Sequence, residues 1–306
     1  GASSLDANTT GGENVAVGTG ALGANTTANS NTAVGHNALL VNTTGTLNTA
    51  VGASALAANT TANSNTAIGD IALTANTTGA ANVAVGRNAL GANTTASNNV
   101  AVGHGAAESN TTGTQNVAIG YQSLDASSTA SYNTAVGYRT LGANTTAQEN
   151  AAFGTDALLA TTTGGRNTAL GAYTLTANTT GTNNTSVGYS ALIANTTGEY
   201  NVAIGRDALK ANTTASNNTA IGTSSLDANT TGDHNVGIGA GTLGALTTAT
   251  NNVAIGRDAL TASNASENVS IGAYSMDANT TGGNNVAVGY NVLGANTTGG
   301  QNTAVG

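Results

Sequence analysis

The chain has 306 residues, including 42 Gly but no Pro, Cys or Trp, and only 7% of its residues are charged. The net charge of −8 comes from scattered acidic residues, and no basic run exists, which excludes the electrostatic footprint of a nucleic-acid-binding protein. The absence of Cys excludes disulfides and thiolate metal sites, and no apolar run approaches the ~20 residues of a membrane-spanning helix.

A repeat of 17 residues, N-[TV]-A-[VI]-G-x-x-A-L-x-A-N-T-T-[GA]-x-x, fills the sequence. When places are counted from its first Asn, the Gly at place 5 recurs every 17 residues, with one step of 16 between Gly256 and Gly272. A fixed period of this kind is typical of a solenoid, whose units bury apolar faces only against their neighbours. We therefore expect residues 1–306 to form a single repeat array. Gly1 and Gly306 share one place of the repeat, as expected of an excerpt from a longer chain.

Each repeat contains two short apolar runs, which in the repeat starting at Asn14 are residues 15–17 and 21–24. Each run is followed by turn-prone residues, Gly in one case and Asn-Thr-Thr in the other, and no apolar face recurs at helical spacing. The pattern predicts an all-β fold: a parallel β-solenoid, or β-roll, of about eighteen 17-residue coils with two short strands per coil.

Side-chain alternation along a strand predicts which places face inward. Because places 2, 4, 9 and 11 are mostly apolar, as in Val15, Val17, Leu22 and Ala24, we expect them to form a thin core. Place 3 should then face outward.

The Asn at place 1 does not vary. Stacked identical Asn side chains can hydrogen-bond the coils above and below, which satisfies backbone groups that would otherwise be buried unpaired. We therefore predict a structural Asn ladder, which begins with Asn14, Asn31, Asn48, Asn65, Asn82, Asn99, Asn116 and Asn133.

Place 3 is Ala in nearly every coil, and its departures, Ser186, Gly237 and Ser270, are also small. A free surface column should vary as places 6 and 7 do, so we predict that this column packs against another chain. Two alternatives stay open: Ala suits a crowded turn, or the inward and outward faces are reversed. The predicted oligomer-facing column begins with Ala16, Ala33, Ala50, Ala67, Ala84 and Ala101.

The segments "NVAIGRDAL", at 201–209 and 252–260, and "NTAVG" resemble the head repeats of YadA-like trimeric autotransporter adhesins. The N-T-A-[VI]-G…N-T-T-G pattern is also similar to repeat arrays of phage tail-fibre-like proteins. This resemblance implies a left-handed parallel β-roll, normally trimeric, displayed on a cell or virion surface. It implies that Val202 and Ile204 are core aliphatics and that Gly205 is the turn. The present repeat departs from the adhesin pattern in its greater length and in the frequent Thr at place 2.

No catalytic or metal-binding constellation is found, so we predict neither an enzyme nor a cofactor. His36 and His104 share a column but lie four coils apart, too far to share a metal ion. Asp207 and Asp258, which follow Arg residues, are interpreted as solvated charges. Each Asn-Thr-Thr triplet matches the N-glycosylation pattern, although Asn equally suits a turn. Tyrosines on adjacent coils, such as Tyr121 and Tyr138, leave open a weak carbohydrate patch.

The favoured hypothesis is a non-catalytic, extracellular structural or adhesive fibre segment, the stalk or head of a trimeric adhesin or tail-fibre-like protein. Its partner would be the chain itself, as a homotrimer or an end-to-end fibre, with glycans or a host surface as further partners. No nucleic acid and no membrane insertion are expected for this segment. Two alternatives are an ice-binding solenoid and a self-assembling single-chain filament. Thr files such as Thr26 and Thr27 favour ice binding, but the Thr-x-Thr spacing of a double file is absent.

Overall fold

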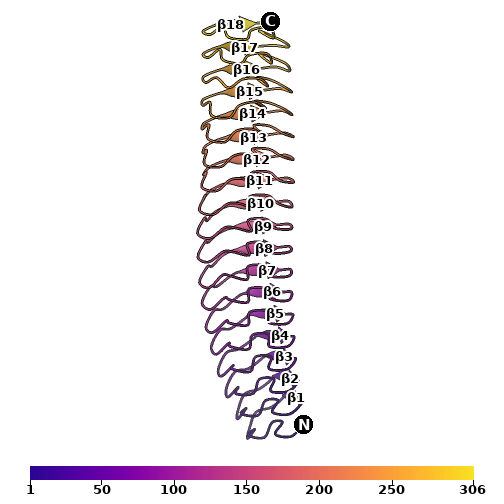
Figure 1. Cartoon of the computed structure of the whole chain (residues 1–306). Helices are drawn as coiled ribbons and strands as arrows, with labels where there is room; N and C mark the ends of the chain where they lie inside the picture. The colour runs from indigo at the N-terminus through magenta and orange to yellow at the C-terminus, as the bar shows by residue number, and fades with distance from the viewer. The chain divides into compact units, whose positions relative to one another are not determined.

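The computed structural model describes all 306 residues, and none of them lies in a helix, so no helix is present that could cross a membrane. The chain forms two compact units, Gly1–Asn150 and Ala151–Gly306, and each is a stack of β-solenoid coils (Figure 1). The β-solenoid of about 17-residue coils predicted from the repeat is confirmed, whereas the expectation of one array through residues 1–306 stays a prediction.

Each coil contributes one strand of three residues. In the first unit each strand pairs in parallel with the strand of the next coil, so that every place lies directly beside the same place one coil later, as in Ala84 beside Ala101. The strands of this unit are β1 (Val15–Val17), β2 (Thr32–Val34), β3 (Thr49–Val51), β4 (Thr66–Ile68), β5 (Val83–Val85), β6 (Val100–Val102), β7 (Val117–Ile119) and β8 (Thr134–Val136).

The second unit repeats this parallel pairing. The short coil does not disturb it, because Val253 pairs with Val269, sixteen residues later, in the same register. The strands are β9 (Ala151–Phe153), β10 (Thr168–Leu170), β11 (Thr185–Val187), β12 (Val202–Ile204), β13 (Thr219–Ile221), β14 (Val236–Ile238), β15 (Val253–Ile255), β16 (Val269–Ile271), β17 (Val286–Val288) and β18 (Thr303–Val305).

Glycine at place 5 ends each strand, because the chain turns there in a conformation that disfavours side chains. Gly103, for example, has φ = 137°, and a Cβ built on it would clash with the carbonyl oxygen of Gly120 in the next coil. Only a residue without a Cβ allows such close stacking of backbones.

The second strand predicted near places 8–11 is not formed. This segment is a series of tight turns, in which Ala21 N–H donates to Gly18 O and Asn25 N–H donates to Leu22 O. Place 9 has a positive φ, 50° at Leu22, which points its N–H at the next coil, where it donates to Ala38 O at 3.0 Å. A left-handed conformation costs roughly 1–2 kcal/mol for such a residue. Burial of the Leu side chain contributes about 1.5–3 kcal/mol and offsets that cost.

The core of each coil is formed by places 3, 8 and 9, which are mostly Ala, Ala and Leu. In the coil that starts at Asn82 these are Ala84, Ala89 and Leu90, all with no exposed surface. Leu at place 9 was predicted to be buried, and this is confirmed. The prediction that places 2, 4 and 11 are also buried is wrong. The side chains of places 2 and 4 lie on the outer side of the strand, and place 11 is half-buried, as at Ala24.

The side chains at places 3 and 8 pack closely against each other, as the surroundings of Gly237 show. At Gly237, an added Cβ would lie 2.7 Å from Ser225 Oγ and 3.0 Å from Thr242 Oγ1. Those two hydroxyls are 2.7 Å apart, and Ser225 Oγ donates to Gly237 O at 2.9 Å. At this position Gly at place 3 therefore leaves room for the paired hydroxyl side chains at place 8 of its own coil and of the coil before it.

The Asn ladder predicted at place 1 is present in the structure. The Asn31 side-chain oxygen accepts a hydrogen bond from the Asn48 backbone N–H at 3.0 Å, and Asn48 Nδ2 donates to Ala62 O at 2.8 Å. Asn31 and Asn48 are buried, and Asn14, in the first coil, is half-buried. Each Asn thus joins two coils and also closes its own coil.

A second Asn ladder lies at place 12, the Asn of the Asn-Thr-Thr triplets. Asn42 Nδ2 donates to Asn25 Oδ1 at 3.1 Å and to Gly45 O at 2.9 Å, and both Asn side chains are fully buried. N-glycosylation would require this buried Nδ2, which already makes two hydrogen bonds. The folded coil therefore favours the structural interpretation of the triplets over glycosylation.

Candidate interaction surface

The Ala column at place 3 does not lie on a surface. Ala33, Ala50, Ala67, Ala84 and Ala101 have no exposed surface within a single chain, and Ala16 is half-buried in the first strand. The prediction that this column faces another chain is therefore wrong, and the alternative of reversed faces holds. The physical reason is the narrow interior: a coil filled by one Leu and two Asn side chains has room for Ala, but not Val, on the strand.

The side chains of places 2 and 4 form the outer surface of the strands instead, which we call the strand face. Most strands have a buried middle residue between two partly exposed ones. Exposed fractions at place 4 include 41% for Ile68, 38% for Ile119 and 38% for Ile204. Phe153, the only Phe of the chain, also lies on this face.

Parallel pairing aligns the strand face into two ranks. Val83 lies beside Val100 in the place-2 rank, and Val85 lies beside Val102 in the place-4 rank. Place 2 alternates irregularly between Val and Thr, with one Ala, whereas place 4 is always Val, Ile, Leu or Phe. Each unit therefore carries an ordered, largely apolar surface made from every coil.

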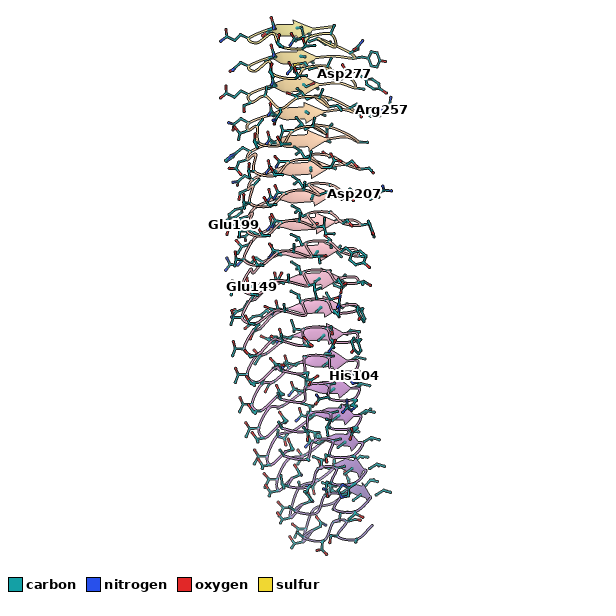
Figure 2. The ribbon with its side chains drawn as sticks, in the orientation of Figure 1. His104, Glu149, Glu199, Asp207, Arg257 and Asp277 are labelled. Carbon is teal, nitrogen blue, oxygen red and sulfur yellow. The ribbon has the colours of Figure 1, made fainter.

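Place 6 borders the strand face on the side where the strands end, and in the first unit it carries a column of interacting side chains. Arg87 Nε lies 3.5 Å from Asp70 Oδ2, and Arg87 Nη1 lies 3.2 Å from His104 Nε2. The His104 ring stacks on Tyr121, which stacks on Tyr138, with 5.5 Å between ring centroids in both pairs. His104 is labelled at this edge in Figure 2.

Charges cluster at the same edge in the second unit, where Figure 2 shows Asp207 and Arg257 beyond the ends of the strands and Glu199 on the opposite side. Asp207 Oδ2 lies 3.0 Å from Arg206 Nε, and Asp207 Oδ1 lies 3.4 Å from Lys210 Nζ. The hydrogen bond from Arg206 is the main reason that the pKa of Asp207 is below its usual value, with Lys210 contributing in the same direction.

Two carboxylates at place 10 have the opposite perturbation. Burial raises the pKa of Asp125, and the neighbouring charge of Glu108 raises it further. Burial also raises the pKa of Asp227, and Asp207 adds a smaller effect in the same direction. No group of three His, Asp or Glu residues in the structure could hold a metal ion.

The three histidines do not meet. His36 and His234 are exposed, whereas His104 belongs to the stacked column. The sequence pattern predicts only part of this column, the tyrosines on adjacent coils, whereas the structure shows that Asp70, Arg87 and His104 continue the same line. The signal was their common place 6 on consecutive coils.

No family model matches this chain, and no curated protein is similar to it.

Proposed function

We propose that this chain is a non-catalytic structural segment of an extracellular fibre, assembled from parallel copies of the chain that pack through their strand faces. The observation that carries the proposal is place 4. The residue at place 4 is apolar in every coil. Many of these side chains nevertheless expose a third or more of their surface. A column that met only water would include polar residues, as places 6 and 7 do.

The size of the strand face supports a stable contact. Roughly 40 Å² of exposed surface from each of sixteen side chains in β1–β8 gives on the order of 600 Å². This value is at the upper end of the apolar patches that monomers expose, and it approaches the ~800 Å² that one partner buries in a stable complex. The near absence of charge on this face removes the desolvation cost that charged groups would add.

The resemblance to trimeric adhesin and tail-fibre repeats supports a homotrimer displayed on a cell or virion surface. In such an assembly the segment holds a binding tip away from that surface, and the variable places 6, 7 and 17 are the positions open to glycans or a host surface. The exposed Tyr132 and Tyr200 lie at place 17.

Ice binding is a second candidate, and the observations that support it lie on the strand face rather than on the Thr files. The Thr files at places 13 and 14 do not form a double file, because place 13 donates its hydroxyl to the next coil, as in Thr43 Oγ1 to Thr60 O at 3.1 Å. The strand face, however, has two ranks in register with Thr and Val at place 2, as in Thr49 beside Thr66. A regular array of methyl and hydroxyl groups on a single chain favours an ordered water layer.

Analytical ultracentrifugation of the wild-type chain and matched Lys variants separates these functions. We expect a discrete species at three times 29.3 kDa. The double variant Ile68→Lys/Val85→Lys should be a monomer, because each substitution places an uncompensated charge in the contact. The control Thr44→Lys/Thr61→Lys carries the same added charge at exposed place 14 and should remain a trimer.

A wild-type monomer, or equal dissociation of both double variants, would contradict the strand-face contact. Freezing-point hysteresis of a wild-type monomer, abolished by Ile68→Lys/Val85→Lys but not by the control, would instead support ice binding.

A further inference from the structure

The stacked Tyr121 and Tyr138 rings are arranged for covalent coupling. Their planes differ by 10° and their centroids are 5.5 Å apart. Both residues occupy place 6, so the two side chains leave equivalent backbone positions in the same direction. Because the rings are nearly parallel and start from equivalent places, equivalent ring carbons, including those ortho to the hydroxyl, are separated by about the same distance as the centroids.

The coils hold these rings together. Arg139 N–H donates to Tyr121 O at 3.0 Å, and Gly137 N–H donates to Ile119 O at 2.8 Å, so the backbones on both sides of Tyr138 are bonded to the previous coil. The Arg139 guanidinium lies over the Tyr138 ring, with its central carbon 5.1 Å from the ring centroid, and the His104 ring stacks on Tyr121. The pair is thus pre-positioned, which raises the rate of any reaction between its members.

Both rings are also open to an external oxidant, since 45% of Tyr121 and 47% of Tyr138 is exposed. The chain has no Cys and no Trp, and its single Met, Met276, is fully buried. Surface tyrosines are therefore the main accessible groups that a one-electron oxidant can attack, and no thiol competes for the oxidising equivalents.

We propose that Tyr121 and Tyr138 are an oxidative cross-linking site, at which a peroxidase-type oxidant with hydrogen peroxide joins the two rings as dityrosine within one chain. Each phenol loses one electron and one proton, which gives two phenoxyl radicals. The radicals form a carbon–carbon bond between ortho positions, and both rings regain aromaticity as the ortho hydrogens move to the phenol oxygens. One hydrogen peroxide accepts the two electrons and two protons and becomes two waters. The product joins adjacent coils and encloses the 16 residues between Tyr121 and Tyr138 in a covalent loop.

The same chain contains an internal comparison. Tyr173 and Tyr189 also lie on adjacent coils, at 5.7 Å between centroids, but their rings meet edge to face at 84°. Tyr274 and Tyr290 meet in the same way at 86°. In these pairs one ring directs its edge at the face of the other, so the two rings do not present equivalent carbons to each other, although Tyr173, Tyr189 and Tyr290 are exposed and Tyr274 is half-buried.

The test is treatment of the full chain with horseradish-type peroxidase and hydrogen peroxide, followed by mass spectrometry and dityrosine fluorescence. We expect a chain of unchanged size that has lost two hydrogens. Cleavage before Asp125, which separates the two tyrosines in sequence, should leave their peptides joined. Tandem mass spectra should place the link at Tyr138 rather than at Tyr132, and its yield should exceed that of Tyr173–Tyr189 by at least about tenfold, because misplaced reacting atoms lose rate steeply.

Two Phe variants keep the rings and the fold but remove one coupling partner. Tyr138→Phe should lose the intrachain product, whereas Tyr189→Phe should leave its yield unchanged. The proposal is overturned if Tyr138→Phe retains the product, if the edge-to-face pairs couple equally well, or if only chain-to-chain dimers form.

Discussion

The place-12 Asn ladder is interrupted at Ser127, and this interruption gives the sharpest prediction about stability. Two buried side-chain atoms there have no hydrogen-bond partner, Asn110 Oδ1 and Ser127 Oγ. In an intact part of the ladder, such as Asn93, Nδ2 donates both to the previous Asn, at 2.8 Å from Asn76 Oδ1, and to Ala96 O at 3.1 Å. Ser127 is too short to make either contact.

We expect Ser127→Asn to stabilise the first unit. The new amide would donate to Asn110 Oδ1 and to Ala130 O, and the column has room, because Asn110 and Asn144 occupy the same place one coil away on each side. An unsatisfied buried polar atom costs about 1–3 kcal/mol, and side-chain ordering takes back part of the gain, so the expected increase in the free energy of unfolding is about 1–2 kcal/mol.

Hydrogen exchange measures this effect locally, which matters because the stability of a repeat stack is a sum over neighbouring units. The amides of Thr111 and Thr112 donate to Ser128 O at 2.9 and 3.2 Å and report on this contact. Their exchange by opening of the coil should slow roughly 5–30-fold. Denaturant unfolding supplies the corresponding global value.

Ser127→Asp is the matched control, because it has the shape of Asn but cannot donate when ionised. It places a carboxylate against Asn110 Oδ1 and should destabilise the unit by about 3 kcal/mol or more. If Ser127→Asn is no more stable than wild type, or is as unstable as Ser127→Asp, the ladder does not stabilise the coils as the hydrogen bonds suggest.

The remaining predictions concern packing, backbone and charge. Ala84→Val should lower the free energy of unfolding by about 1–3 kcal/mol through overpacking, measured by denaturant unfolding; a neutral result would mean that place 3 is not confined. Gly237→Ala should destabilise the protein by a similar amount. Gly103→Ala should destabilise it by more, because the new Cβ would clash with backbone and Ala would also have to adopt a positive φ. Equal melting temperatures for wild type, Gly237→Ala and Gly103→Ala would contradict this expectation. Because the pKa of Asp125 is raised on folding, its contribution to stability is greatest below the usual Asp pKa and is lost as pH rises through the raised value. Asp125→Asn should therefore stabilise by about 0.5 kcal/mol at pH 7 and by less at pH 3, with Asp227→Asn behaving in the same way in paired unfolding curves.

The period, the parallel stacking and the place-1 ladder could be predicted from the sequence because each depends on repetition alone. An invariant Asn such as Asn48 has to be buried and paired with its neighbours in any stacked arrangement. The turn segment could not be predicted, because Leu22 adopts a positive φ that its residue type disfavours. Inter-coil hydrogen bonding and burial together override that local preference, and only the three-dimensional stack shows them.

The direction of the strand side chains cannot be predicted from hydrophobicity alone, because Val is more hydrophobic than Ala and yet lies on the outer side of the strand. Alternation fixes that places 2 and 4 oppose place 3, but it does not fix which side is inward. Side-chain volume decides which side of the strand faces inward, and the sequence contains some evidence of this. Each departure from Ala at place 3 is accompanied by a hydroxyl residue at place 8: Ser186 contacts Thr174, Gly237 makes room for Ser225, and Ser270 lies in the coil of Ser275.

These contacts put place 3 in the interior with place 8. It follows that the constant apolar residues of place 4, rather than the constant Ala, form the exposed column to which the proposed contact between copies of the chain is assigned.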